Sequence, residues 1–237
     1  MLLPKKIHPS WQPLLTEAIR EEITRIETSI GNDFNPIPHE NTLRFLETDL
    51  DHTHVIWLGQ DVYPAEGVAT GRAFEAGNIK SWLQPFRQVS LKNIVRAIYC
   101  AYFNIKNYRD IPPYSELKKQ IKADKFPLLP PAQWFASLER QGVLFLNTSF
   151  TCRIGKPNSH KAIWSHFSHE TIKYISARRP DMIWFLWGRE AQANKDYIST
   201  GKIMESRHPS RVNEAYEDDF LKFDGFSKTD DIINWLG

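Results

Sequence analysis

The stretch Val55-Ile56-Trp57-Leu58-Gly59-Gln60-Asp61-Val62-Tyr63 sets four apolar residues directly before a glycine, an amide and a carboxylate. A short apolar run followed by small and polar residues is typical of a buried strand that ends in a loop. Open parallel sheets bind ligands at the carboxyl ends of their strands, because connecting loops converge there and helix starts offer free N–H groups. Asp61 is therefore the first candidate for a functional residue.

Four strands separated by helices are predicted along the chain. The strands are expected over residues 55–58, 143–146, 182–187 and 202–205, and the helices over 10–30, 91–103, 114–123, 132–140, 163–177 and 191–197, with Ser10 as the first N-cap. Alternating strands and helices form βαβ units, so we expect a three-layer α/β/α fold with a central four-stranded parallel sheet. The proline clusters are too short for interdomain linkers, and residues 1–237 are predicted to form one domain.

The composition is that of an ordinary globular protein. The chain has 237 residues and a formal net charge of +2, which does not by itself indicate a polyanionic partner. Cys100 and Cys152 lack a CxxC spacing and are expected to be buried thiols in a reducing compartment. No signal peptide and no stretch near the ~20 apolar residues of a membrane span is found, so we expect a cytoplasmic protein. The eight tryptophans are expected mainly in the core.

Polar residues follow every predicted strand and should meet at one edge of the sheet. They are residues 59–63, 147–149, 188–190 and 207–210. Taken alone, Asp61 would more often be a turn or cap residue, and His208 a structural histidine. Asn147 alone would be a turn former. Their convergence on one cleft favours a functional role for all three.

Several common kinds of active site are excluded by missing motifs. The chain has no GxSxG, Walker, GxGxxG or HExxH pattern, which removes the usual support for esterase, nucleotidase, Rossmann and zincin activities. His166 and His169 are spaced i, i+3 without a neighbouring carboxylate pair, so no metal site is predicted. The expected cleft holds an acid/base residue, an amide, an imidazole and aromatic rings without a cofactor. Such a set suits recognition and cleavage of a heterocycle.

The motifs at these strand ends resemble those of uracil-DNA glycosylases of the family 1 type. Gly59-Gln60-Asp61-Val62-Tyr63-Pro64 resembles the family's Gly-Gln-Asp-Pro-Tyr-His, and Gln141 to Asn147 resembles its Gln-Gly-Val-Leu-Leu-Leu-Asn. Asn158-Ser159-His160, the run from Phe185 to Gln192 and His208-Pro209-Ser210 follow in the family's order. The resemblance extends from about Trp11 to the C-terminus.

The resemblance implies a set of base-binding residues. Phe74 would stack on a uracil that has left the DNA duplex, and the amide of Asn147 would read its O4 and N3–H edge. Tyr63 would occupy the space beside C5, where the methyl group of thymine would clash. The backbone N–H of Gln60 would make a further contact with the base.

The resemblance also implies two catalytic residues. The glycosidic bond breaks through an oxocarbenium-like sugar and a leaving uracil anion. Asp61 as a carboxylate would stabilise the cation and orient or deprotonate the attacking water. His208 would donate a hydrogen bond from its neutral ring to O2 of the leaving uracil.

The sequence departs from the family pattern at the loops expected to contact DNA. Val62 and Pro64 replace the family's proline and histidine, so the loop that holds Asp61 is expected to be supported differently. Ser90, Ser210 and Arg189 are candidate phosphate contacts, the last in place of a serine. Where the family inserts a leucine into the gap left by the flipped base, this chain has Arg211, Val212 and Asn213. Arg211 or Val212 would fill that gap.

The resemblance implies uracil-containing single- or double-stranded DNA as the substrate, a monomer, and a uracil-DNA glycosylase inhibitor protein as a further partner. Two alternatives remain: a glycosylase-like DNA-binding or replication accessory protein with weak activity, and a glycosylase for another damaged pyrimidine. The joint presence of Asp61, Tyr63, Phe74, Asn147 and His208 argues against a pure binding protein. Tyr63 argues against a bulky group at C5.

Overall fold

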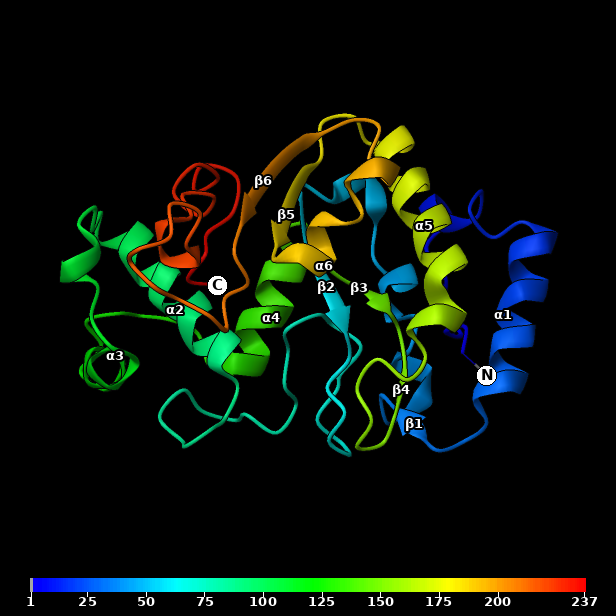
Figure 1. The fold of residues 1–237 in the computed structure, drawn as a ribbon, viewed down its shortest axis with the longest axis horizontal. Coiled ribbons are helices and arrows are strands. Elements are labelled where there is room, and N and C mark those ends of the chain that lie inside the picture. Colours follow the sequence, from blue (N-terminus) through cyan, green and yellow to red (C-terminus); the bar gives the residue numbers. More distant parts are fainter. Residues whose placement is uncertain (1) are drawn as a thin grey trace.

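Four parallel strands form the central sheet in the order β3-β2-β5-β6 (Figure 1). They are β2 (Val55–Asp61), β3 (Val143–Ser149), β5 (Ile183–Trp187) and β6 (Lys202–Ser206). Val55 lies opposite Val143 on one side and Ile183 on the other, so β2 is an inner strand. The structure is a computed structural model that describes residues 2–237. It confirms the predicted four-stranded parallel sheet.

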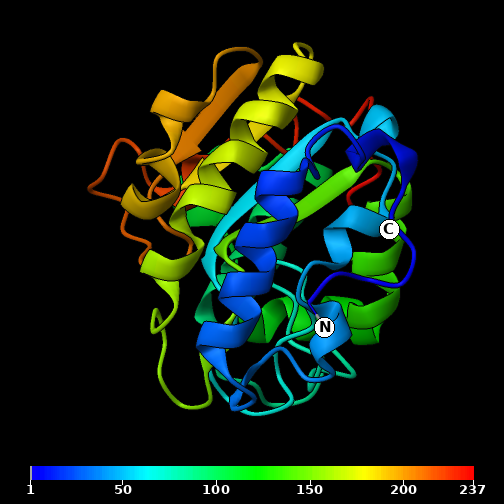
Figure 2. The ribbon, with the colours of Figure 1, turned by 90° about the vertical axis from the view of Figure 1, so that its right-hand side faces the viewer.

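Helices cover both faces of this sheet, as expected for a three-layer fold. Their bounds are α1 (Glu17–Ile30), α2 (Val89–Tyr102), α3 (Tyr114–Lys122), α4 (Pro131–Arg140), α5 (Lys161–Arg178) and α6 (Arg189–Gln192). Helices α1 and α5 lie side by side on one face (Figure 2). Helices α2 and α4 pack on the other face (Figure 1). Two short strands, β1 (Phe34–Asn35) and β4 (Cys152–Arg153), pair separately.

Alternating side chains of β2 supply both layers of the core. Val55 and Trp57 pack with α2 and α4, whereas Ile56 and Leu58 pack with α1 and α5. Successive side chains of a strand point to opposite faces, so a strand covered on both sides must be apolar throughout. The unbroken apolar run therefore places β2 inside the sheet and its polar end, Gln60 and Asp61, at the edge.

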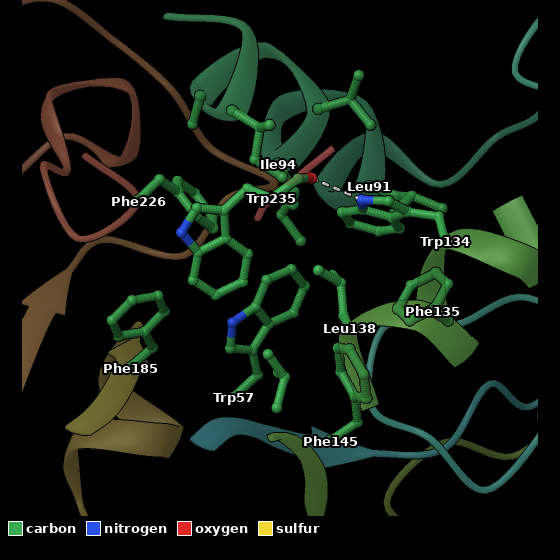
Figure 3. Packing of buried hydrophobic residues seen from close by; sticks show 14 of the residues in the cluster. Trp57, Leu91, Ile94, Trp134, Phe135, Leu138, Phe145, Phe185, Phe226 and Trp235 are labelled. Atoms are coloured by element: carbon green, nitrogen blue, oxygen red, sulfur yellow. Dashed lines mark hydrogen bonds between the residues drawn. The ribbon is translucent and has the colours of Figure 1, made fainter. Parts of the chain in front are cut away.

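Aromatic rings dominate the core on the α2 and α4 side of the sheet. The ring of Trp57 lies 5.0 Å from that of Trp187, 5.1 Å from Phe145 and 5.7 Å from Trp235, measured between centroids. Figure 3 shows Trp57 facing Trp235, with Phe145 beside it. The indole N–H of Trp134 donates to the carbonyl of Trp235 at 2.8 Å, which ties α4 to the C-terminal segment. The prediction that the tryptophans mainly fill the core is confirmed.

The start of the first helix differs from the prediction. Helix α1 begins at Glu17, and its N-cap is Thr16, whose hydroxyl accepts from the N–H of Ile19 at 3.3 Å. Ser10 as the cap is wrong, because Pro9–Trp11 form a separate 3₁₀ turn and α1 starts only after Thr16. The buried Ser10 hydroxyl instead accepts from the N–H of Leu50 at 3.0 Å.

Other expectations concern smaller features. The helix predicted over residues 191–197 is shorter, since α6 ends at Gln192 and a separate 3₁₀ turn covers Lys195–Tyr197. Cys100 and Cys152 are free and buried, as expected. Within the described residues, no helix is both long and apolar enough to cross a membrane.

Candidate active site

A cavity of about 450 Å³ opens at the carboxyl ends of the sheet strands. The residues that line it come from the ends of β2, β3 and β5, the start of α2, and the loop after β6. Among the residues singled out from the sequence, those lining the cavity are Gln60, Asp61, Tyr63, Phe74, Ser90, Asn147, Arg189, His208, Ser210 and Arg211. Val212 does not line it and is half-buried against the core. The sheet therefore brings nearly all of the predicted residues together.

Asp61 is the last residue of β2 and is half-buried in the cavity wall. Its Oδ2 accepts from the backbone N–H of Asn158 at 2.5 Å. Its buried Oδ1 has no protein hydrogen-bond partner among residues 2–237, since the nearby Ser149 hydroxyl donates to the carbonyl of Thr151. Burial raises the pKa of Asp61 above its ordinary value. The site thus holds one carboxylate oxygen in place and buries the other without a protein partner among the described residues.

Asn147 lies on β3 directly opposite Gly59 of β2. Its side chain is buried in the cavity wall, and no protein group in the described chain hydrogen-bonds to its amide. A Cβ at residue 59 would lie 2.4 Å from Asn147 Oδ1 and 2.9 Å from the Cβ of Ala73. Gly59 is therefore the residue that makes room for the amide. A buried carboxamide with free donors and an acceptor can read the polar edge of a flat ligand.

Phe74 presents its ring to the cavity from a strained backbone position. Its φ is 65°, which costs about 1–3 kcal/mol for a residue other than glycine. The ring lies 5.4 Å from that of Trp187 and 6.2 Å from that of Trp57, between centroids. The hydroxyl of Tyr63 donates to the carbonyl of Phe74 at 3.4 Å. Burial raises the pKa of Tyr63, which keeps this phenol protonated.

His208 faces Phe74 across the cavity, with 6.4 Å between the ring centroids. The backbone N–H of Ser210 donates to His208 Nδ1 at 3.2 Å, so Nδ1 is the acceptor and Nε2 carries the proton of the neutral ring. Desolvation and then the charge of Arg211 lower the pKa of His208 below its ordinary value. A Cβ on Gly188 would lie 2.8 Å from that of His208, so a glycine is needed beside it.

The loop after Asp61 is supported by distant segments of the chain. The carbonyl of Pro64 accepts from the Asn35 side chain at 2.9 Å and from the N–H of Gly155 at 2.8 Å. The Val62 side chain is buried next to Cys152. These contacts join the loop to β1 and β4.

The rim of the cavity carries cations, hydroxyls and a free helix start. Ser90 is the second residue of α2, whose N-cap residue makes no side-chain cap. Arg189 begins α6 and is exposed, as are Ser210 and Arg211. Helix starts, guanidinium groups and hydroxyls are the usual partners of phosphate oxygens. The described residues hold no group of three or more His, Cys, Asp or Glu placed to bind a metal ion.

Residues 46–229 match the family model described as the uracil DNA glycosylase superfamily. The chain belongs to the uracil-DNA glycosylase superfamily. A uracil-DNA glycosylase from Francisella philomiragia is 30% identical over 247 residues, covering 95% of this chain and 99% of the relative. This agreement extends over nearly the whole chain, as did the resemblance in the motifs.

Solved structures of family members show the same fold. A UNG crystal structure from Nitratifractor salsuginis aligns with a TM-score of 0.70 at 22% identity, covering 96% of this chain and 93% of the other. A mimivirus UNG variant in complex with UGI aligns with a TM-score of 0.63 at 22% identity, covering 88% and 71%. The predicted α/β/α architecture is therefore that of the superfamily.

Asn158 is a cavity residue that was not predicted as functional from the sequence. Asn158 has a φ of 61°, its N–H binds Asp61, and its Oδ1 accepts from the Gln60 side chain at 2.8 Å. The sequence signal was the Asn158-Ser159-His160 motif, which gave no indication that a backbone group would act. Trp187 and Glu190 also line the cavity beside Gly188.

Proposed function

We propose that this chain excises uracil from DNA by hydrolysing the N-glycosidic bond, which leaves an abasic site and begins base excision repair. The observation that carries the proposal is that Asp61 and Asn147 share one cavity, where neither Asp61 Oδ1 nor the Asn147 amide has a hydrogen-bond partner among residues 2–237. Phe74 and His208 complete the wall of the same cavity. Few other reactions call for a carboxylate, a free amide, a stacking ring and a neutral imidazole together.

Base recognition falls to four residues in this proposal. Uracil enters the cavity from the duplex at a cost of a few kcal/mol, which stacking and edge hydrogen bonds must offset. Phe74 stacks on the ring, and the Asn147 amide donates to O4 and accepts from N3–H. The backbone N–H of Gln60 adds a contact. Tyr63, fixed by its bond to the Phe74 carbonyl, excludes the methyl group of thymine.

Bond cleavage falls to Asp61 and His208. The carboxylate of Asp61 stabilises the developing sugar cation and orients or deprotonates the attacking water. The Nε2–H of His208 donates to O2 of the leaving uracil anion, where its neutral form, favoured by a lowered pKa, is the donor. One group thus offsets the positive charge and the other the negative charge of the transition state.

DNA contacts are proposed at the rim. Ser90, Arg189 and Ser210 bind phosphates, and Arg211, exposed at the cavity mouth, enters the gap left by the flipped base. Val212 is the weaker candidate for that gap because it packs against the core. The acidic residues of the same loop do not line the cavity; they are Glu214, Glu217, Asp218 and Asp219. Asp218 forms an ion pair with Arg207 at 2.7 Å.

We also propose a single-domain, cytoplasmic monomer. Both helix layers pack on one shared sheet, which favours one domain over two. Free, buried cysteines fit a reducing compartment. A glycosylase inhibitor protein is a further proposed partner, because a mimivirus UNG variant of the same fold forms a complex with UGI.

The test uses oligonucleotides that carry U:A, U:G or T:G pairs or a single-stranded uracil, incubated without metal and cleaved with alkali at abasic sites. We expect release of uracil but not of thymine. Asp61→Asn and His208→Leu should each lower the rate at least ~100-fold, the scale of losing a general base or an oxyanion donor. Asp196→Asn, an exposed carboxylate outside the cavity, is the matched control. A near-wild-type rate for Asp61→Asn would overturn the assignment.

A further inference from the structure

A largely buried ion network lies behind the wall of the cavity and takes no part in the proposed reaction. It consists of Arg72, Glu75, Glu139 and Arg44, here called the Arg72 network. Arg72 donates from Nε and Nη2 to the two carboxylate oxygens of Glu139, at 2.9 and 2.6 Å. Its Nη1 donates to Glu75 Oε2 at 3.0 Å. The Arg72 and Glu75 side chains are only 11% and 8% exposed.

The network encloses the residue that presents the stacking ring. Arg72 and Glu75 stand on either side of Ala73 and Phe74 in the chain, and they are bonded to each other. The Thr70 hydroxyl donates to Glu75 Oε2 at 2.6 Å, and the N–H of Arg72 donates to the same hydroxyl at 3.3 Å. The charges therefore close a short loop whose tip is the left-handed backbone of Phe74.

Glu139 joins this loop to the body of the protein. It is on the last turn of α4, which packs against the sheet through Trp134, Phe135 and Leu138. The N–H of Ala73 also donates to the carbonyl of Phe145 on β3, at 3.4 Å. The bidentate pair between Arg72 and Glu139 thus fixes the loop to α4. The hydrogen bond of Ala73 holds the loop alongside the edge strand β3.

Stability alone does not account for such a network. Replacing a buried ion pair with apolar side chains is often neutral or stabilising, whereas bidentate geometry specifies one conformation. We propose that Arg72 is a positioning residue, which holds Phe74 in the strained conformation that stacks on the base. This inference rests on the proposed role of Phe74 in uracil binding.

The first experiment measures Arg72→Leu for kcat, KM and the Kd of free uracil. Stacking of a base on an aromatic ring is worth about 5- to 150-fold in binding. We expect KM and the Kd of uracil to rise together by about 10-fold, with a smaller change in kcat. Arg179→Leu is the matched control, because its side chain is also 11% exposed and makes a bidentate pair with Asp181, and neither residue lines the cavity. It should lower stability and leave KM unchanged.

The second experiment separates positioning from stability. Arg72→Leu combined with Glu75→Gln and Glu139→Leu removes both carboxylates that lose their cation, so thermal stability should recover while KM stays high. Recovery of KM together with stability would overturn the proposal. In a Phe74→Ala background, Arg72→Leu should raise KM less than about 2-fold, because the ring it positions is absent. A full additional 10-fold rise would also overturn it.

The measurements also separate failure of the positioning role from failure of the proposed function and from misfolding of the variant. If Arg72→Leu does not fold, the same measurements are made on Arg72→Lys, which keeps the charge but loses the bidentate pair, and an unchanged KM refutes the proposal. If the wild-type protein releases no uracil, the proposed function fails. If it releases uracil and Arg72→Leu leaves KM unchanged, only the positioning role fails.

Discussion

At the scale of the residue, Asp61 is held in an environment that opposes its charge. Burial raises its pKa, and Oδ1 lacks a protein partner in the described chain. A raised pKa means that the folded state favours the neutral acid relative to the unfolded state. The ionised side chain therefore lowers the free energy of unfolding. This loss of stability is complete at pH values above the raised pKa, and it disappears at pH values below 3.8, the ordinary pKa of the group in the unfolded state.

We therefore expect Asp61→Asn to be more stable than the wild type at pH 7. The amide keeps an oxygen for the N–H of Asn158 and removes the buried charge. The difference in Tm should narrow as the pH falls towards 3.8, measured by thermal unfolding between pH 4 and pH 8. An Asp61→Asn protein that is less stable at pH 7 would show that the carboxylate is a net stabilising group.

At the scale of the element, the carboxyl end of β2 delivers two residues of the site and makes room for a third. Gln60 and Asp61 close the strand, while Gly59 lets the amide of Asn147 lie against the backbone. The parallel pairing of β2 with β3 sets Gly59 opposite Asn147. The strand register thus determines the position of the Asn147 amide, which we propose reads the base.

Gly59→Ala should displace Asn147 without unfolding the sheet. Its Cβ would lie 2.4 Å from Asn147 Oδ1, so the amide must move. A misplacement near 1 Å can cost about 100-fold in rate, and we expect a fall of that order in kcat/KM on single-stranded uracil. Gly31→Ala is the control, since nothing lies within 4 Å of the added methyl group and the strain at its φ of 68° falls outside the cavity. Equal activity of both variants would refute this account of Asn147.

At the scale of the whole molecule, one face must meet DNA although the chain carries a formal net charge of only +2. Cations near the cavity mouth therefore matter more than the total charge. Arg211 is the exposed cation of the loop after His208. Its guanidinium can stack on bases as well as bind phosphate.

Arg211→Ala should reduce uracil release from duplex DNA more than from single strands. Only the duplex has a gap to fill when the base leaves the stack. We expect a loss of about 10-fold on U:A duplexes, equivalent to ~1.4 kcal/mol, and a smaller loss on single-stranded uracil. Both substrates are assayed at one salt concentration, because phosphate binding depends on salt. Equal losses on the two would assign Arg211 to phosphate binding alone.

The central sheet and most of the residues that line the cavity could be predicted from the sequence, because both follow from local patterns. Apolar runs mark the strands, and parallel topology then gathers their polar ends, including Asp61, Asn147 and His208. The contact of Asp61 with a backbone N–H could not be predicted, since Asn158 lies far away in the chain. The ion pair between Arg72 and Glu139 also joins residues that are far apart in the sequence. Such contacts depend on tertiary packing and leave no periodic signal.

The strand order also determines how long each strand remains without its sheet neighbour while the protein is being synthesised. The inner strand β2 begins at Val55, but its neighbour β3 begins only at Val143. At ~5–20 residues per second, the apolar run of β2 waits roughly 4–18 s on the ribosome before a sheet partner appears. His208 is made later still, after β6. The nascent chain therefore carries an unpaired apolar segment, open to chaperones or aggregation, until its catalytic site can be completed.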